Sequence, residues 1–242
     1  MLRAAVLFTS TLAFAGCVAD SGGEGFVILN NTAITGDTCT LTGAAGQGFV
    51  AHGQINSGSP SGYLLTPLFQ SAITATGMDL QRTILLSGAN VELSVVAMTV
   101  THPDGSITNP TLPALSGTDA KFRVLFSGSL PPGGTANFAF EVLPVSTIHT
   151  IMASAAAGAD DSVNAEVTAK VTADGTMGGD RVNSAPFTYP ITVCNDCVIV
   201  DRGACSEFMG EARIGNACNP FQDGPVDCCE DPTAGLVCPA GM

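Results

Sequence analysis

An all-β protein is predicted, in which an antiparallel β-sandwich is followed by a small disulfide-rich C-terminal segment. Only 12% of the 242 residues are charged, whereas the chain holds 28 Gly and 14 Pro and lacks Trp. Long surface helices need Glu, Lys and Arg, so this composition favours strands joined by turns. Short apolar runs occupy positions 26–193, and seven of the nine cysteines lie beyond them. We therefore divide the chain into residues 1–16, 17–25, 26–193 and 194–242.

Residues 1–16 predict a secretory signal peptide. A basic start at Arg3 is followed by an apolar run over 4–15, and a glycine precedes Cys17. Such a run is too short to span a membrane as a stable helix and is typical of exported proteins. The stretch 12–17 (LAFAGC) resembles the bacterial lipobox, in which the peptidase cuts just before a cysteine that becomes lipid-modified. The alternative is an ordinary signal peptide cut at a nearby small residue, with Cys17 incidental.

The resemblance implies that Cys17 carries three acyl chains. Each buried methylene adds about 0.8 kcal/mol, so three chains hold a protein firmly on a membrane. Residues 17–25 then form a short, polar, Gly-rich tether. Val18, rather than Asp, follows the cysteine, which in enteric bacteria resembles a signal for sorting to the outer membrane. We expect a lipid-anchored cell-envelope protein at the outer membrane, facing the periplasm or the cell surface.

The charge balance excludes one class of partner. The formal net charge is −13, from 21 acidic and 8 basic residues. A strongly acidic surface repels nucleic acid and anionic headgroups, so we expect no nucleic-acid partner. The expected partners are the membrane, through the N-terminal lipid, and a protein or a glycan.

The cysteine count fits an oxidising compartment. With Cys17 used for the lipid, eight of the nine cysteines remain, and an even number fits four disulfides. The predicted disulfide cysteines are Cys39, Cys194, Cys197, Cys205, Cys218, Cys228, Cys229 and Cys238.

The region 26–193 is predicted to form a sandwich of the immunoglobulin-like type. Its apolar runs are short and are separated by Gly, Pro, Asn and Asp, a pattern typical of such sandwiches. Gly88 is expected to end one strand, and the turn 101–105 the next. The predicted strands are 26–29, 48–51, 63–65, 83–86, 92–100, 122–126, 138–142, 163–173 and 187–193.

The clearest pattern is the run 163–173, where Val or Ala alternates with a polar residue without a break. A period of two buries one face of a strand and leaves the other in water. A Gly-rich turn over 174–180 follows, and 187–193 alternates again, so we expect a hairpin with a long turn. Pro186 and Pro190 lack amide donors, which predicts an edge or a bulge for the second strand.

One segment, Ser146–Ala157, is predicted to be helical. Pro144 precedes it, Gly158 follows it, and Ser146 is suited to cap the first turn. A strand is the alternative, because four of its first six residues are β-branched.

Residues 194–242 contain seven cysteines in 49 residues and few long apolar runs, so disulfides must hold this segment together. The adjacent Cys228 and Cys229 would strain the peptide between them if bonded to each other, so we expect separate partners. The stretch 218–238 resembles inhibitor cystine-knot miniproteins in its CC pair and its LVC step, although the sixth knot cysteine is missing from its usual place. Cys39 is expected to pair with Cys194 or Cys197, which would join the first strands to the last.

The CxxC spacing of Cys194 and Cys197 also suits a redox pair or half of a zinc site. A redox pair requires a helix N-terminus at its first cysteine, whereas this motif follows a strand and contains Asp196. A zinc site requires a second matching pair, and the spacing of Cys228–Cys229 is wrong. Structural disulfides are therefore the favoured interpretation.

Catalytic and metal-binding signals are weak. The three histidines, His52, His102 and His149, are not placed by sequence beside a nucleophile, and no G-x-S-x-G motif or phosphate-binding Gly loop is present. The acids at 160–161 and in the turn 174–180 suit Ca²⁺, but solvated turn acids are the favoured interpretation. We predict no catalytic, metal-binding or cofactor-binding residue.

The overall plan resembles the Cys-rich lipoproteins of delta-class proteobacteria, and this resemblance implies envelope attachment but supplies no activity. We expect a structural, adhesion or recognition module rather than an enzyme. One alternative is a glycan-binding module, weakened by the absence of Trp and the presence of only two Tyr. The other is a secreted hydrolase with an unrecognised site. Long turns on a rigid sandwich carry function, and those expected to do so are Ser57–Gly62, Ser129–Gly134 and Asp174–Asp180.

Overall fold

The computed structural model describes residues 24–34, 38–41, 48–74, 82–195 and 197–239. The predicted signal peptide, the lipidation site Cys17 and most of the tether lie outside the described residues. Within them the fold is an all-β sandwich followed by a disulfide-rich segment, as predicted. Two pairings in the main sheet, β1 with β12 and β13 with β2, are parallel rather than antiparallel.

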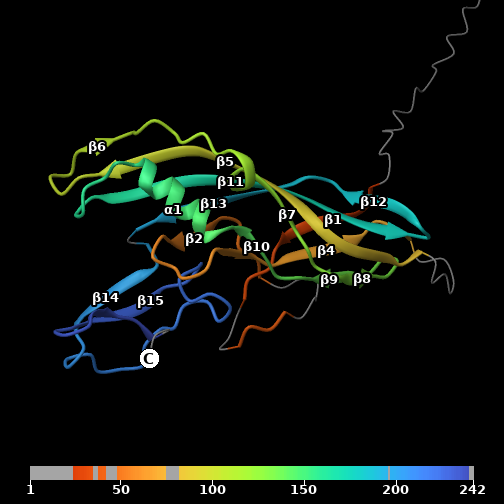
Figure 1. The fold of residues 1–242 in the computed structure, drawn as a ribbon. Coiled ribbons are helices and arrows are strands. Elements are labelled where there is room, and N and C mark those ends of the chain that lie inside the picture. Colours follow the sequence, from red (N-terminus) through yellow and green to blue (C-terminus); the bar gives the residue numbers. More distant parts are fainter. Residues whose placement is uncertain (1–23, 35–37, 42–47, 75–81, 196, 240–242) are drawn as a thin grey trace, which may run out of the picture.

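The largest sheet contains eleven strands and supplies both layers of the sandwich. Its central pair is β5 (Ile84–Thr101) and β11 (Ser162–Met177), which pair antiparallel along nearly their whole length. Figure 1 shows these two long strands side by side in one layer, with β1, β4 and β9 in the facing layer. The other strands of this sheet are β1 (Glu24–Asn31), β2 (Gly53–Asn56), β4 (Pro67–Ser71), β6 (Ile107–Thr108), β7 (Lys121–Val124), β8 (Gly128–Leu130), β9 (Thr135–Asn137), β12 (Asp180–Ser184) and β13 (Phe187–Cys194).

The remaining strands that the structure describes form two smaller sheets. One pairs β3 (Tyr63–Leu65) with β10 (Phe140–Leu143), and the other joins β14 (Ile199–Ala204), β15 (Val226–Asp231) and β16 (Gly235–Val237). A single turn of 3₁₀ helix, η2 (Gly117–Asp119), precedes β7.

The predicted alternation of β11 is confirmed. Every Val and Ala of the run 163–173 is buried, and the residues between them face outward. One edge of β11 pairs with β5, whereas the other is shared by β13 and β12. The buried face contacts residues of the opposite layer such as Phe26 and Phe69 in one continuous core.

The hairpin that follows β11 has a shorter turn and another return strand, β12, than the sequence predicted. The strand continues to Met177, and β12 returns after a turn at Gly178 and Gly179, which both have positive φ. Two positive φ values in succession are what a two-residue hairpin turn requires, so the turn is much shorter than predicted. β13 pairs with β11 as expected, and β2 covers its outer edge only from Ile191 onward. Pro190 lies just before that covered part, where a missing amide donor costs no ladder bond.

Gly88 was expected to end a strand, but it lies inside β5, and the two predicted strands 83–86 and 92–100 are one. Its φ is 154°, and a Cβ at this position would lie 2.4 Å from the carbonyl oxygen of Val124 on β7. Glycine therefore permits a close approach of β7 and an irregular register opposite Asp174 and Gly175 without ending the strand.

Two other predicted strands are displaced. The run 48–51 forms only a bridge from Phe49 to Thr32, and β2 begins at Gly53 instead. The run 138–142 becomes strand at Phe140, where pairing with β3 begins.

The predicted helix is confirmed as α1 (Val145–Ser154), and the alternative of a strand is wrong. Ser146 does not cap it, because Pro144 occupies the N-cap position and no side chain caps the first turn. Ile148 and Ile151, one helical turn apart, are completely buried in the sandwich core. Their burial outweighs the preference of the β-branched residues for a strand.

The eight predicted cysteines pair as four disulfides. Cys228 and Cys229 have separate partners, as expected, and the CxxC cysteines are bonded to each other. The prediction that Cys39 pairs with Cys194 or Cys197 is wrong, since Cys39 pairs with Cys218. The disulfides are Cys39–Cys218, Cys194–Cys197, Cys205–Cys229 and Cys228–Cys238.

The pairing of Cys39 follows from how residues 216–223, here called the docking loop, pack onto the sandwich. The loop runs along β2, where Asn56 N donates to Phe221 O and Asp223 N donates to Gln54 O, each at 3.0 Å. It also bonds β3, where Leu64 N donates to Gln222 Oε1 at 2.8 Å and Gln222 Nε2 donates to Leu64 O at 2.7 Å. The loop thus brings Cys218 to Cys39.

A buried polar cluster lies beneath the docking loop. Tyr63 OH donates to Asp223 Oδ2 at 2.7 Å and lies 3.0 Å from Tyr189 OH, while Asn31 Nδ2 donates to Tyr189 OH at 2.8 Å. Tyr63 and Tyr189 are 0% and 2% exposed. Burial raises the pKa of Asp223 and of Tyr63, and it raises the pKa of Tyr189 to about 12. Each of these polar groups depends on its neighbours for hydrogen bonds.

Replacing Tyr63 by Phe removes a buried hydroxyl that donates to the partly buried Asp223. We expect the free energy of unfolding to fall by about 1–3 kcal/mol, the cost of an unsatisfied buried group, measured by urea denaturation. Asp223→Asn and the double variant complete a double-mutant cycle. The double variant should lose less than the sum of the single losses, and strict additivity would show that the two side chains do not interact.

Candidate functional site

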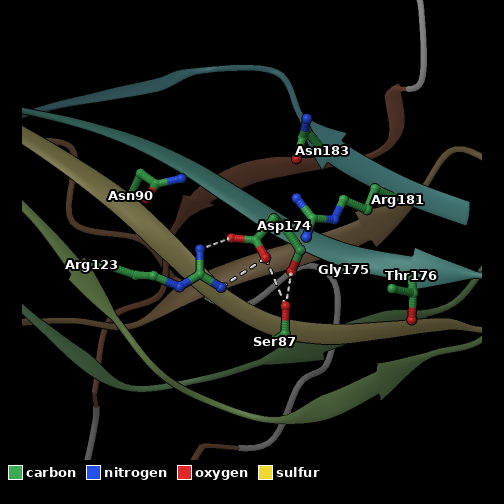
Figure 2. A pocket seen from close by; sticks show the side chains of 8 residues that line it. All are labelled: Ser87, Asn90, Arg123, Asp174, Gly175, Thr176, Arg181 and Asn183. Carbon is green, nitrogen blue, oxygen red and sulfur yellow. Dashed lines mark hydrogen bonds and ion pairs between the residues drawn. The ribbon is translucent and has the colours of Figure 1, made fainter.

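A polar pocket of about 400 Å³ opens on the outward face of the sheet, and we call it the Asp174 pocket. Four strands supply its walls: β5, β7, β11 and β12. Its volume lies within the range of about 300–1,000 Å³ that is usual for small-ligand sites. Figure 2 shows the lining residues, which are Ser87, Asn90, Arg123, Asp174, Gly175, Thr176, Arg181 and Asn183.

The strand register brings these side chains together. Asp174 is paired with Asn183 of β12, Thr176 with Arg181, and Asn90 with Arg123 of β7. Because side chains alternate across a strand, the even-numbered residues of β11 near its end share the outward face. The odd-numbered residues point into the core, and their burial fixes the outward orientation of the even-numbered residues that line the pocket.

Asp174 is the central group of the pocket. Arg123 donates to both carboxylate oxygens, with Nη2 at 2.8 Å from Oδ2, and Ser87 Oγ donates to Oδ2 at 2.7 Å. The hydrogen bond from Arg123 holds the pKa of Asp174 below its usual range, and it raises the pKa of Arg123. Two-point pairing of a guanidinium with a carboxylate restricts both side chains, so this pair is preorganised.

Arg181 is the second cation of the pocket and approaches Asp174 from the side opposite Arg123 (Figure 2). Its charge helps to lower the pKa of Asp174, yet within the described chain its side chain makes no hydrogen bond or ion pair. Other cations do contact a carboxylate: Lys121, Lys170, Arg123, Arg202 and Arg213. Two arginines against one aspartate leave the pocket with one net positive charge, although the chain carries −13.

A second hollow of about 350 Å³ adjoins the first and shares Asn90 and Arg123 with it. It extends along β5 and β7 past Phe122 and an ion pair in which Lys121 Nζ donates to Glu92 Oε1 at 3.0 Å. The two hollows therefore adjoin one another across β5 and β7.

The three loops predicted to carry recognition differ in whether they are exposed and whether they contribute to the Asp174 pocket. The loop Ser57–Gly62 is partly covered: Ser59 is 2% exposed and Asn219 Nδ2 donates to Gly62 O at 2.9 Å, whereas Gly58, Pro60 and Ser61 are exposed. In Ser129–Gly134, the first two residues belong to β8, and only residues 131–134 connect β8 to β9. The segment Asp174–Asp180 does contribute to the pocket, but through strand residues at its start rather than through a long turn.

Two of the histidines, His52 and His102, each contact a hydroxyl and a carboxylate. His52 Nε2 contacts both Thr192 Oγ1, at 2.7 Å, and Glu166 Oε2, at 3.2 Å, so a single nitrogen serves both partners. A nucleophile–base–acid relay instead uses both ring nitrogens of the histidine.

His102 does use both nitrogens, with Nδ1 2.9 Å from Asp161 Oδ1 and Nε2 3.2 Å from Thr108 Oγ1. Asp161 also accepts a hydrogen bond from Gly158 N at 2.7 Å. The three side chains tie the end of β5 to β6 and to the turn after α1. We assign them a structural role, because each bond braces a turn or a short edge strand.

Two of the acids considered for Ca²⁺, Asp161 and Asp174, are engaged by protein groups. Asp161 is bonded to His102 and Gly158, and Asp174 is bonded to Arg123 and Ser87. In the described ranges no three His, Cys, Asp or Glu side chains gather closely enough to hold a metal ion. None of the helices described has the length and apolarity to cross a membrane.

Sequence reasoning missed Arg123, Arg181 and the asparagines of the pocket. The available signal was that Arg181 directly follows the turn segment 174–180. A cation at this place is unusual in so acidic a chain. The pairing of Arg123 with Asp174 joins residues 51 positions apart and depends on strand register. No protein-family model matches the chain, and no curated protein matches it.

Replacing Arg123 by Gln removes the group that lowers the pKa of Asp174. A carboxyl with a lowered folded-state pKa contributes stability above its unfolded pKa, and this contribution is lost as the pH falls toward the folded pKa. We expect the urea midpoint of the unmodified protein to fall more steeply than that of Arg123→Gln between about pH 5 and pH 2. Asp174→Asn, which cannot titrate, should share the shallower slope. Equal slopes in all three proteins would contradict this role of the ion pair.

Proposed function

We propose that this protein is a recognition module, anchored by a lipid to a bacterial envelope membrane, that binds a polar ligand in the Asp174 pocket. The observation that carries the proposal is the convergence of polar side chains from four strands on a pocket where Arg181 has no carboxylate partner. Lining groups of this kind orient a ligand by hydrogen bonds rather than by apolar contact. A hydroxyl-rich ligand suits them best, because Asn90, Asn183 and Thr176 each offer a donor and an acceptor.

Rigid support favours binding at this place. β5 and β11 are paired along the length of the pocket, and Arg123 is bonded to Asp174 before any ligand arrives. A preorganised site loses less side-chain entropy when a ligand binds. Sites built on strands are also better defined than sites on loops.

The sequence supports the membrane anchor. The stretch 12–17 resembles a lipobox, and the tether up to residue 25 is short and polar. Four disulfides are consistent with an oxidising compartment outside the cytoplasm. Attachment through Cys17 would hold the sandwich near the membrane while its pocket faces solvent.

Filling the pocket should abolish recognition. We expect the mature, detergent-solubilised protein to bind members of an array of neutral and acidic oligosaccharides, and Thr176→Trp to lose that binding because the indole occupies the pocket. Thr168→Trp is the matched control, since Thr168 lies on the same face of β11 but does not line the pocket. Binding retained by Thr176→Trp, or no binding by the unmodified protein, would overturn the proposal.

The anchor predicts a definite mass. Protein extracted from native membranes should begin at Cys17 and carry three acyl chains. Its mass should rise by about 8 Da on reduction, two hydrogens for each of four disulfides. An unlipidated chain cut at another residue would refute the anchor, and free thiols before reduction would refute the disulfide set.

A further inference from the structure

The chemistry of the Asp174 pocket narrows the class of its ligand. Arg123 is already neutralised by Asp174, so the charge available to a ligand is that of Arg181. A single uncompensated guanidinium matches a single carboxylate, because its planar fork can donate two parallel hydrogen bonds. A chain of phosphates would require several free cations along its path.

The residues that line the Asp174 pocket indicate the chemistry of the rest of the ligand, beyond its carboxylate. Apart from Gly175, every lining residue carries an amide, a hydroxyl, a guanidinium or a carboxylate, and none is aliphatic or aromatic. A ligand with an apolar body would leave these groups without hydrogen-bond partners, which costs free energy when they are desolvated. Sugar hydroxyls both donate and accept, as do the side chains of Asn90, Asn183 and Thr176.

The second hollow indicates that the ligand extends beyond one ring. Because it shares Asn90 and Arg123 with the Asp174 pocket, a linear ligand can continue into it without leaving the sheet surface.

From these three observations we infer that the ligand is an acidic oligosaccharide of the uronate type, whose carboxylate pairs with Arg181 and whose hydroxyls bond Asn90, Asn183 and Thr176. The inference rests on the proposed function and names the ligand class of the same pocket. Because the pocket is positive in an otherwise acidic protein, an anionic ligand is attracted to this site and repelled by the remaining surface, which directs it to the pocket.

The test uses trisaccharides in which one galacturonate, glucuronate or mannuronate residue is joined to two neutral sugars, each compared with its methyl ester, which keeps the hydroxyls but loses the charge. Binding to the mature, detergent-solubilised protein is measured by calorimetry. At least one acidic trimer should bind, and its methyl ester should bind about tenfold more weakly or worse. Arg181→Gln should weaken binding of the acidic trimer by a similar factor and leave binding of the ester nearly unchanged.

Lys170→Gln is the matched control, since it removes the same charge from the same sheet face at a residue outside both hollows. It should change the affinity by less than about twofold. Equal binding of acid and ester, equal effects of the two substitutions, or no binding of any acidic trimer would overturn the inference. In those cases the oligosaccharide array still tests the proposed function. If the unmodified protein binds neutral glycans and Thr176→Trp does not, the pocket is a recognition site but its ligand is not acidic.

Discussion

The antiparallel pairing of β5 with β11 joins Thr101 to Ser162 at one end and Leu85 to Thr176 at the other, and the other parts of the sandwich are placed by it. β13 and β12 share the free edge of β11, while β6, β7 and β8 pair with β5. A shift of one residue in this register would turn every buried Val and Ala of β11 to the solvent. The burial of these side chains therefore fixes the orientation of each outward residue as well.

The Asp174 pocket is a consequence of that register. The same alternation that buries the odd-numbered residues of β11 presents Asp174 and Thr176 on the outer face, where β7 and β12 bring an arginine each. Gly88 is essential to this arrangement, because a side chain there would collide with the backbone of β7. The geometry of the site thus depends on core packing, and its two arginines come from the neighbouring strands β7 and β12.

The C-terminal segment is held to the sandwich by different forces. Its docking loop contacts the sandwich mainly through hydrogen bonds: Asn219 and Gln222 donate to backbone carbonyls of the sandwich, and Asp223 accepts from Tyr63. Such a polar interface is favourable only when every member is satisfied, which makes its geometry specific. The disulfide Cys39–Cys218 spans 179 residues and, in the chain-entropy model, contributes about 5 kcal/mol by constraining the unfolded chain. Covalent and polar constraints here replace the apolar core that so short a segment cannot build.

The sequence by itself determined the features that depend on local pattern. The all-β class, the alternation of 163–173, the helix within 146–157 and the separate partners of Cys228 and Cys229 follow from composition, period or the stiffness of adjacent residues. Only the tertiary structure decided that Gly88 lies inside β5 without ending it, that Cys39 meets Cys218, and that Arg123 and Arg181 converge on Asp174. Each of these depends on the register of segments far apart in the chain, and register is set by the packing of two complete faces rather than by any local run of residues.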